Sequence, residues 1–131
     1  MNANRFEMVV RTLLALALVV FGADKFFHYM PMPEAPEEGG QYLGALMGTG
    51  YIFPIIGGIF LTAALCLVSK RVLLGLMLVS PILVNIIAYH VRYDLPGIIG
   101  GAVLSGLVVL LFMLHAGNLG LLFRPNSVGH K

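Results

Sequence analysis

Residues 8–27 read MVVRTLLALALVVFGADKFF, an apolar run interrupted by only three charged residues. A helix that crosses a bilayer needs about 20 residues of this character, so the run predicts a transmembrane helix over residues 8–28. Arg5 and Arg11 would also suit a cleaved signal peptide. However, the bulky Phe21 is a poor residue at the third position before a cleavage site after Ala23. We therefore interpret the first segment as a membrane span.

The composition of the whole chain agrees with a membrane protein. Hydrophobic residues make up 59% of the 131 positions and charged residues only 11%, against about 25% charged in ordinary globular proteins. The length suits a single domain. Acidic and basic residues nearly balance and are scattered, so no nucleic-acid partner is expected. Cys66 is the only cysteine, which excludes an internal disulfide and a CxxC redox pair.

Three further apolar segments follow the first. The sequence therefore predicts an all-α fold, a transmembrane four-helix bundle that forms a single integral membrane domain over residues 1–131. The helices are expected at about residues 8–28, 48–69, 72–90 and 95–115. Prolines and glycines between residues 31 and 40 mark the connection over residues 29–47 as a loop.

The distribution of basic residues predicts the orientation, because cytoplasmic segments carry an excess of Lys and Arg. Six of the eight basic residues lie at one predicted end of the bundle: Arg5, Arg11, Lys70, Arg71, Arg124 and Lys131. Five of the six acids lie in the first and third connections: Asp24, Glu34, Glu37, Glu38 and Asp94. The prediction is an N-in/C-in topology with an outer loop over residues 29–47 and a cytoplasmic tail over residues 116–131. Its first part, residues 116–123, either extends the fourth helix or lies along the inner interface.

Residues 21–33, FGADKFFHYMPMP, place ionisable groups where the first helix leaves the lipid. An ionisable group at bilayer depth costs roughly 2.5–3.5 kcal/mol on translocon scales, so such groups usually have partners or a function. The spacing of Asp24, Lys25 and His28 places them on one helical face. Asp24 and His28, four residues apart, are expected to meet, whereas the adjacent Asp24 and Lys25 are expected to point apart.

Other polar residues are predicted at the same outer level. Asn85 and Tyr89 share a face of the third helix, whereas His90 lies about 100° around from Tyr89 and joins them only if the helix end is distorted. We predict a polar pocket at the outer end of the bundle. It is built from Asp24, Lys25, His28, Tyr51, Asn85 and His90. Histidine with tyrosine or lysine in this pocket would donate hydrogen bonds to the carbonyl oxygens of a quinone head group.

The alternative interpretation is an interfacial belt, since Tyr, Lys and Arg prefer the headgroup region of a bilayer. The belt is the favoured interpretation for Tyr29, Tyr42, Arg92 and Tyr93. For Asp24 and Asn85, a structural hydrogen bond and a functional role stay equally open.

An isolated pair of histidines, His28 and His90, is weak evidence for a metal or haem, so no metal site is predicted. Met30 and Met32 flank prolines and are interpreted as apolar surface anchors. The sequence identifies no catalytic residue.

The sequence resembles the DoxX family of small four-helix bacterial membrane proteins over residues 11–114. Three segments carry the resemblance: FGADKFFHYMPMP at 21–33, TGYIFP at 49–54 and SPILVNIIAYH at 80–90. The resemblance implies a location in the bacterial inner membrane. It also implies an association with thiosulfate:quinone oxidoreduction, membrane redox complexes and oxidative-stress defence. The matching positions have no assigned roles: Asp24, Lys25, His28, Pro31, Pro54, Pro81, Asn85 and His90.

The expected function is that of a membrane subunit in a quinone-linked redox or oxidative-stress system. An accessory or non-catalytic subunit is favoured over a self-contained enzyme, because the chain has no cysteine pair and no flavin or dinucleotide motif. Quinone is the only cofactor suggested. The expected partners are the lipid bilayer, a protein of a redox complex and a second copy of the chain. One alternative is a membrane scaffold or assembly factor whose acidic outer loop docks another protein. A small-solute permease ranks lowest, since four helices leave little room for a pathway.

Overall fold

The structure, a computed structural model, describes residues 2–32 and 34–129; Pro33 and the predicted tail residue Lys131 lie outside this part. The described residues form helices and turns and contain no β-strand, which confirms the predicted all-α class. In chain order the elements are α1 (Ala3–Phe27), α2 (Glu37–Gly48), α3 (Ile52–Val68), α4 (Val72–Tyr93), the 3-10 helix η1 (Leu95–Ile98), α5 (Ile99–Leu114), α6 (Ala116–Leu119) and the 3-10 helix η2 (Gly120–Phe123).

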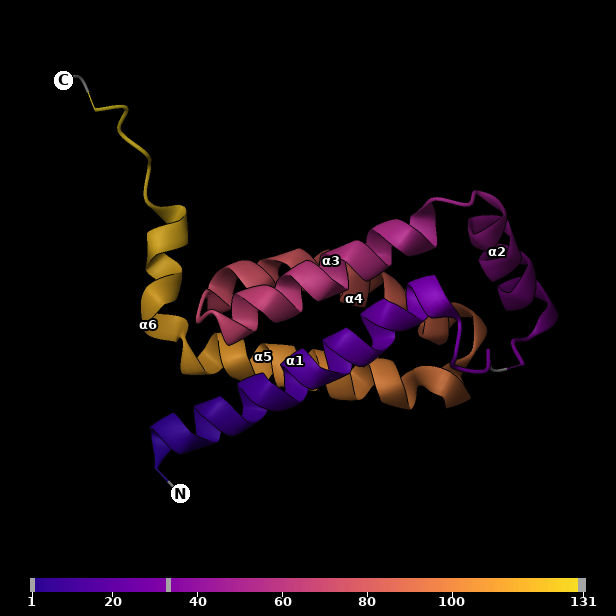
Figure 1. Ribbon diagram of the computed structural model, residues 1–131, viewed down its shortest axis with the longest axis horizontal. Coiled ribbons are helices and arrows are strands. Elements are labelled where there is room, and N and C mark those ends of the chain that lie inside the picture. Colours follow the sequence, from indigo (N-terminus) through magenta and orange to yellow (C-terminus); the bar gives the residue numbers. More distant parts are fainter. Residues whose placement is uncertain (1, 33, 130–131) are drawn as a thin grey trace.

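Four long helices form a bundle in which each helix packs against two neighbours. α1 packs against α3 and α5, and α4 packs against the same two helices from the other side. Figure 1 shows these helices running side by side, with α2 across one end of the bundle and α6 at the other. The first cavity described below lies at the end that α2 crosses.

Leucines fill the centre of the bundle. The side chains of Leu14, Leu18, Leu67, Leu76 and Leu111 are fully buried, together with Phe60 from α3. Leu14 and Leu18 are four residues apart on one face of α1, and both are buried. Burial of this apolar face therefore places Asp24 and Lys25, in the last turn of α1, next to the interior of the bundle.

The outer surface of the bundle is also apolar. Large exposed side chains include Leu13, Leu16, Val84, Ile99, Val103 and Val109. Extended apolar surface of this kind is unusual on a soluble monomer. Among the described residues, α1, α4 and the continuous segment Leu95–Leu114 are long and apolar enough to cross a membrane. Contact with a lipid bilayer follows from these features.

The first helix was predicted over residues 8–28. In the structure α1 begins earlier, at Ala3, and ends one residue earlier, at Phe27. Asn2 caps the helix, because its side-chain oxygen accepts a hydrogen bond of 2.9 Å from the backbone N–H of Arg5. The helix ends where His28 adopts a left-handed backbone conformation with φ of 51°. This conformation turns the chain away from the helix axis.

Part of the segment predicted as a loop, residues 29–47, is helical. α2 begins with Glu37 and Glu38, whose charges favour the N-terminus of a helix. A turn through Gly50, with φ of 74°, then separates α2 from α3. The two helices meet at 83°, so they form a fourth candidate span only if the bent pair is counted as one segment. The second long helix begins at residue 52 rather than 48.

The later helices differ from the prediction mainly at their ends. α4 continues to Tyr93 instead of residue 90 and passes through Pro81 without a break in the helix. The fourth predicted helix, 95–115, starts as η1 and continues as α5. α5 ends before His115, and residues 116–123 form α6 and η2, which turn away from α5 (Figure 1). The tail therefore does not extend the fourth helix.

Candidate functional site

Two neighbouring cavities lie beside α2. The first, which we call the aromatic cavity, has a volume of about 250 Å³ and lies among α1, α2, α3, α4 and α5. Its lining is mainly apolar, with Phe53 and Phe60 of α3 among the largest side chains. Its polar lining residues are Lys25, Tyr42, Asn85, Tyr89, His90 and Asp94.

Three tyrosines join α2 to the end of α4. The ring of Tyr42 stacks on Tyr89 and Tyr93, with centroid separations of 5.8 and 5.9 Å. Gly39 allows this approach, because a Cβ atom there would lie 2.8 Å from the hydroxyl oxygen of Tyr89. The aromatic contacts fix α2 as one wall of the cavity.

The hydroxyl group of Tyr89 is buried and has no hydrogen-bond partner among the described residues. A buried hydroxyl without a partner loses its bonds to water, at a cost of about 1–3 kcal/mol. Tyr89 also lines the aromatic cavity. An oxygen atom of a bound molecule would satisfy this donor.

His90 lines the same cavity and is held by Asp94. Its Nδ1 atom lies 3.2 Å from the backbone carbonyl oxygen of Asp94 and 3.5 Å from the carboxylate Oδ2. Because a carbonyl oxygen only accepts, Nδ1 carries the proton in the neutral ring and Nε2 is left as the acceptor. The prediction that His90 joins Tyr89 only if the helix end is distorted is wrong, since both line the cavity while α4 stays helical to Tyr93.

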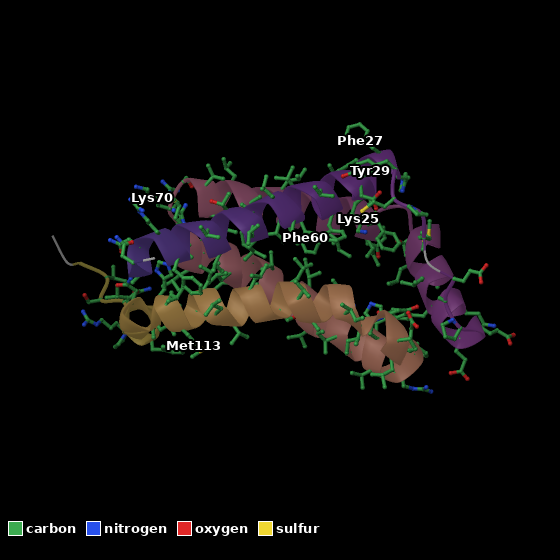
Figure 2. The ribbon with its side chains drawn as sticks, turned by 90° about the horizontal axis from the view of Figure 1, so that it is seen from below. Lys25, Phe27, Tyr29, Phe60, Lys70 and Met113 are labelled. Atoms are coloured by element: carbon green, nitrogen blue, oxygen red, sulfur yellow. The ribbon has the colours of Figure 1, made fainter. Side chains whose placement is uncertain are left out.

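Lys25 lines both cavities from the end of α1. Its Nζ atom lies 3.8 Å from Oδ2 of Asp24 and 5.6 Å from the centroid of the Phe53 ring. The prediction that Asp24 and Lys25 point apart is therefore wrong, because the flexible lysine chain curls back toward its neighbour. Figure 2 shows Lys25 near the α2 end of the bundle, with Lys70 at the opposite end.

The second cavity, which we call the loop cavity, has a volume of about 490 Å³ and adjoins the first at Phe21, Lys25, Leu43 and Phe53. It contains Asp24 and His28, but their side chains do not pair as expected. His28 instead donates its backbone N–H to the carbonyl oxygen of Asp24. The carboxylate of Asp24 accepts a hydrogen bond of 2.7 Å from the backbone N–H of Met30. The left-handed turn at His28 explains the change, since it removes the ring from the helical face.

The structure thus divides the predicted pocket. Lys25, Asn85 and His90 line the aromatic cavity, whereas Asp24 and His28 line the loop cavity with Lys25. Tyr51 lies outside both and is 60% exposed, because it precedes α3 at the bend after α2. His28 and His90 face different cavities. No three His, Cys, Asp or Glu side chains gather as metal ligands within residues 2–32 and 34–129.

The predicted pocket did not include Tyr42, Tyr89 or Asp94, all of which line the aromatic cavity. Tyr42 was assigned to the interfacial belt because tyrosine prefers the headgroup region of a bilayer. The spacing of His90 and Asp94, four residues apart, was the signal that could have identified their contact. Exposed Arg92 fits the belt interpretation better: it lies 3.5 Å from Glu38 of α2, outside the cavity lining.

A second polar cluster joins the helices at the opposite end of the bundle. Glu7 Oε1 accepts from Nε of Arg11 at 2.9 Å and lies 3.1 Å from Nε2 of His115. Arg11 also donates to the backbone carbonyl of Leu67 at 2.9 Å. This cluster ties α1 to the ends of α3 and α5 and has no part in either cavity.

Comparison of the chain with protein-family models, curated proteins and solved structures finds no match in any of the three.

Proposed function

We propose that the aromatic cavity binds the ring of a quinone. The unpartnered hydroxyl of Tyr89 carries this proposal, because a quinone carbonyl oxygen accepts the hydrogen bond that the protein leaves unmade. The side-chain amide of Asn85 supplies a second donor on the same wall. Phe53 and Phe60 provide apolar surface for the ring.

The size of the cavity suits a single ring. Small-molecule pockets usually measure roughly 300–1,000 Å³, so a cavity of about 250 Å³ is closer in size to one ring than to a large cofactor such as a flavin dinucleotide. Its mainly apolar lining with a few polar groups is typical of small-molecule sites. A ligand that dissolves in lipid also suits a protein with an apolar outer surface.

We further propose a four-span protein of the bacterial inner membrane with both termini in the cytoplasm. The second span is α3, and α2 lies at the outer surface. The positive-inside rule supports this orientation, because Lys70 lies at the end of the bundle opposite Lys25 and the cavities (Figure 2). Membership of the DoxX family is part of the proposal and rests on the sequence resemblance. The motifs that carry the resemblance at residues 21–33 and 80–90 also supply much of the cavity lining.

Within this framework the protein acts as an accessory subunit of a redox or oxidative-stress system, holding quinone for a partner. Side chains of the cavity bind and orient the ring: Tyr89 and Asn85 donate hydrogen bonds to the carbonyl oxygens of the quinone. Nε2 of His90 cannot donate to these oxygens in the neutral ring, and instead offers an acceptor to a hydroxyl group of the reduced quinol. Asp94 keeps the imidazole in that tautomer through Nδ1. Electrons come from the partner protein, because the chain carries no redox cofactor motif.

Thermal unfolding of the purified protein with a short-chain quinone tests the proposal. Binding to the folded state raises the melting temperature, by an amount that corresponds to about 2.7 kcal/mol at a hundredfold excess over Kd. Tyr89→Phe should abolish most of the shift. It should also raise the stability of the free protein, since it removes a buried hydroxyl that lacks a partner.

Tyr51→Phe is the matched control, because Tyr51 lies outside both cavities and is exposed. It should leave the quinone-dependent shift and the stability unchanged. An unchanged shift in Tyr89→Phe, or no shift in the wild type in membranes that contain its partners, would refute the quinone site.

The charge on α2 favours a second candidate, a scaffold or assembly factor. Glu34, Glu37 and Glu38 are all exposed beside the cavities and would attract a basic surface of another protein. A permease remains the weakest candidate, since fully buried leucines fill the bundle centre.

A further inference from the structure

Three methionines and one histidine are among the residues that line the loop cavity. His28, Met30 and Met32 reach it from the segment after α1, and Met47 reaches it from the last turn of α2. From this grouping we propose that the loop cavity is a binding site for a soft monovalent metal ion, Cu(I). The ligands are the three thioether sulfurs and the imidazole of His28. The proposal does not depend on the quinone site.

Local hydrogen bonds hold the ligand-bearing segment in place. The backbone N–H of Met30 donates to the carboxylate of Asp24, and the Tyr29 hydroxyl donates to the carbonyl oxygen of Val20. The left-handed turn at His28 directs the following residues back over the end of α1. These contacts place two methionines, separated by Pro31, along one wall of the cavity.

The chemistry of the donors selects the ion. Thioether sulfur is a soft ligand that prefers Cu(I), whereas Mg²⁺, Ca²⁺ and Mn²⁺ prefer oxygen. The one carboxylate in the cavity, Asp24, is engaged by the backbone N–H of Met30 and by Lys25. Asp24 and Lys25 also cancel each other's charge, so the site offers no net negative charge for a divalent ion. Neutral sulfur and nitrogen ligands suit a monocation.

A metal ion can enter the proposed site from outside the protein. Met32 and Met47 are 55% and 43% exposed, so an ion can reach the sulfurs from outside the bundle. The cavity of about 490 Å³ is larger than a metal ion. Binding therefore draws the side chains together, which the three rotatable bonds of methionine permit.

The competing interpretation is that these methionines are apolar anchors. Substitution of methionine by leucine distinguishes the two interpretations, because leucine keeps the apolar volume of the side chain but has no sulfur atom. Exchanges of Met for Leu usually cost less than about 1.5 kcal/mol, so the variants should fold.

The test is competition for Cu(I) between the purified protein and a chromogenic Cu(I) chelator under reducing conditions. Wild type should bind one ion per chain. The triple variant Met30→Leu/Met32→Leu/Met47→Leu should lose at least about tenfold in affinity. His28→Ala should weaken binding by at least about tenfold, because it removes a ligand, and loss of a group that only hydrogen-bonds to a ligand already costs roughly 10–100-fold.

The matched control is Met8→Leu/Met77→Leu/Met113→Leu, which removes three exposed thioethers elsewhere on the helices. It should bind Cu(I) as wild type does. Equal affinity in the loop-cavity triple variant, an equal loss in the control, or tighter binding of Zn²⁺ than of Cu(I) would overturn the proposal. The quinone-dependent stabilisation should persist in the loop-cavity variant, so failure of one site is distinguishable from failure of the other.

Discussion

Gly22 of α1 and Gly57 of α3 bring the backbones of the two helices into contact. A Cβ atom at Gly57 would lie 2.8 Å from the carbonyl oxygen of Gly22, and one at Gly22 would lie 3.2 Å from the carbonyl oxygen of Gly57. Small residues at such crossings let membrane helices approach closely. The crossing lies next to Lys25, because a Cβ atom at Gly57 would also lie 2.9 Å from the Cβ atom of Lys25. It therefore sets the distance between α1 and α3, which form two walls of the aromatic cavity.

Gly57→Ala should destabilise the protein, because the new methyl group meets backbone and cannot be accommodated by rotating a side chain. We expect a loss of about 1–3 kcal/mol, measured as a lower melting temperature in detergent. Gly58→Ala is the control, since a Cβ atom there meets nothing within 4 Å. Equal effects of the two substitutions would show that the α1–α3 contact is looser than described.

Glu7→Gln should also lower stability, since Glu7 connects Arg11 of α1 with His115 after α5. All three side chains are at most 23% exposed. Loss of charge-assisted hydrogen bonds at such a site costs about 1–3 kcal/mol, measurable by thermal unfolding.

The control for this cluster is Glu38→Gln, which breaks an ion pair whose partners, Glu38 and Arg92, are 70% and 67% exposed. Solvent and salt screen such a pair, so the change should stay within about 0.5 kcal/mol. A larger effect at Glu38 than at Glu7 would contradict this ranking.

The orientation can be measured by cysteine labelling in a Cys66→Ala background, which removes the buried native thiol. Glu37→Cys should react with a membrane-impermeant thiol reagent added to intact spheroplasts, because α2 is proposed to lie outside. Lys70→Cys should react only after the membrane is opened. The reverse pattern would place both cavities on the cytoplasmic side.

The long helices were predictable because apolar runs of about 20 residues have few alternatives to a buried or lipid-facing helix. α2 was missed because the prolines and glycines between residues 31 and 40, among them Gly39 and Gly40, were interpreted as marking a loop. The structure shows that Gly39 serves packing, since it admits Tyr89. Tertiary contact therefore overrides local preference at α2.

The candidate site was predictable only in part. Positions near the outer ends of the predicted spans placed Lys25, Asn85 and His90 at one level, and they line one cavity. Helical spacing failed for His28, because the helix ends there in a left-handed turn that no pattern in the sequence signalled. The partition into two cavities depends on that turn and on α2, so it needed the three-dimensional structure.

The bend between α2 and α3 also has a consequence for the surrounding lipid. The 17 residues of α3, the proposed second span, rise about 25 Å, less than the hydrocarbon thickness of about 30 Å, whereas the 25 residues of α1 rise about 37 Å. A bilayer adapts to a short span by thinning beside it. We expect the membrane to be thinnest along α3, which favours shorter acyl chains and brings the bend close to the lipid tails. The aromatic cavity beneath α2 would then be nearer to molecules dissolved in the membrane than to those in water.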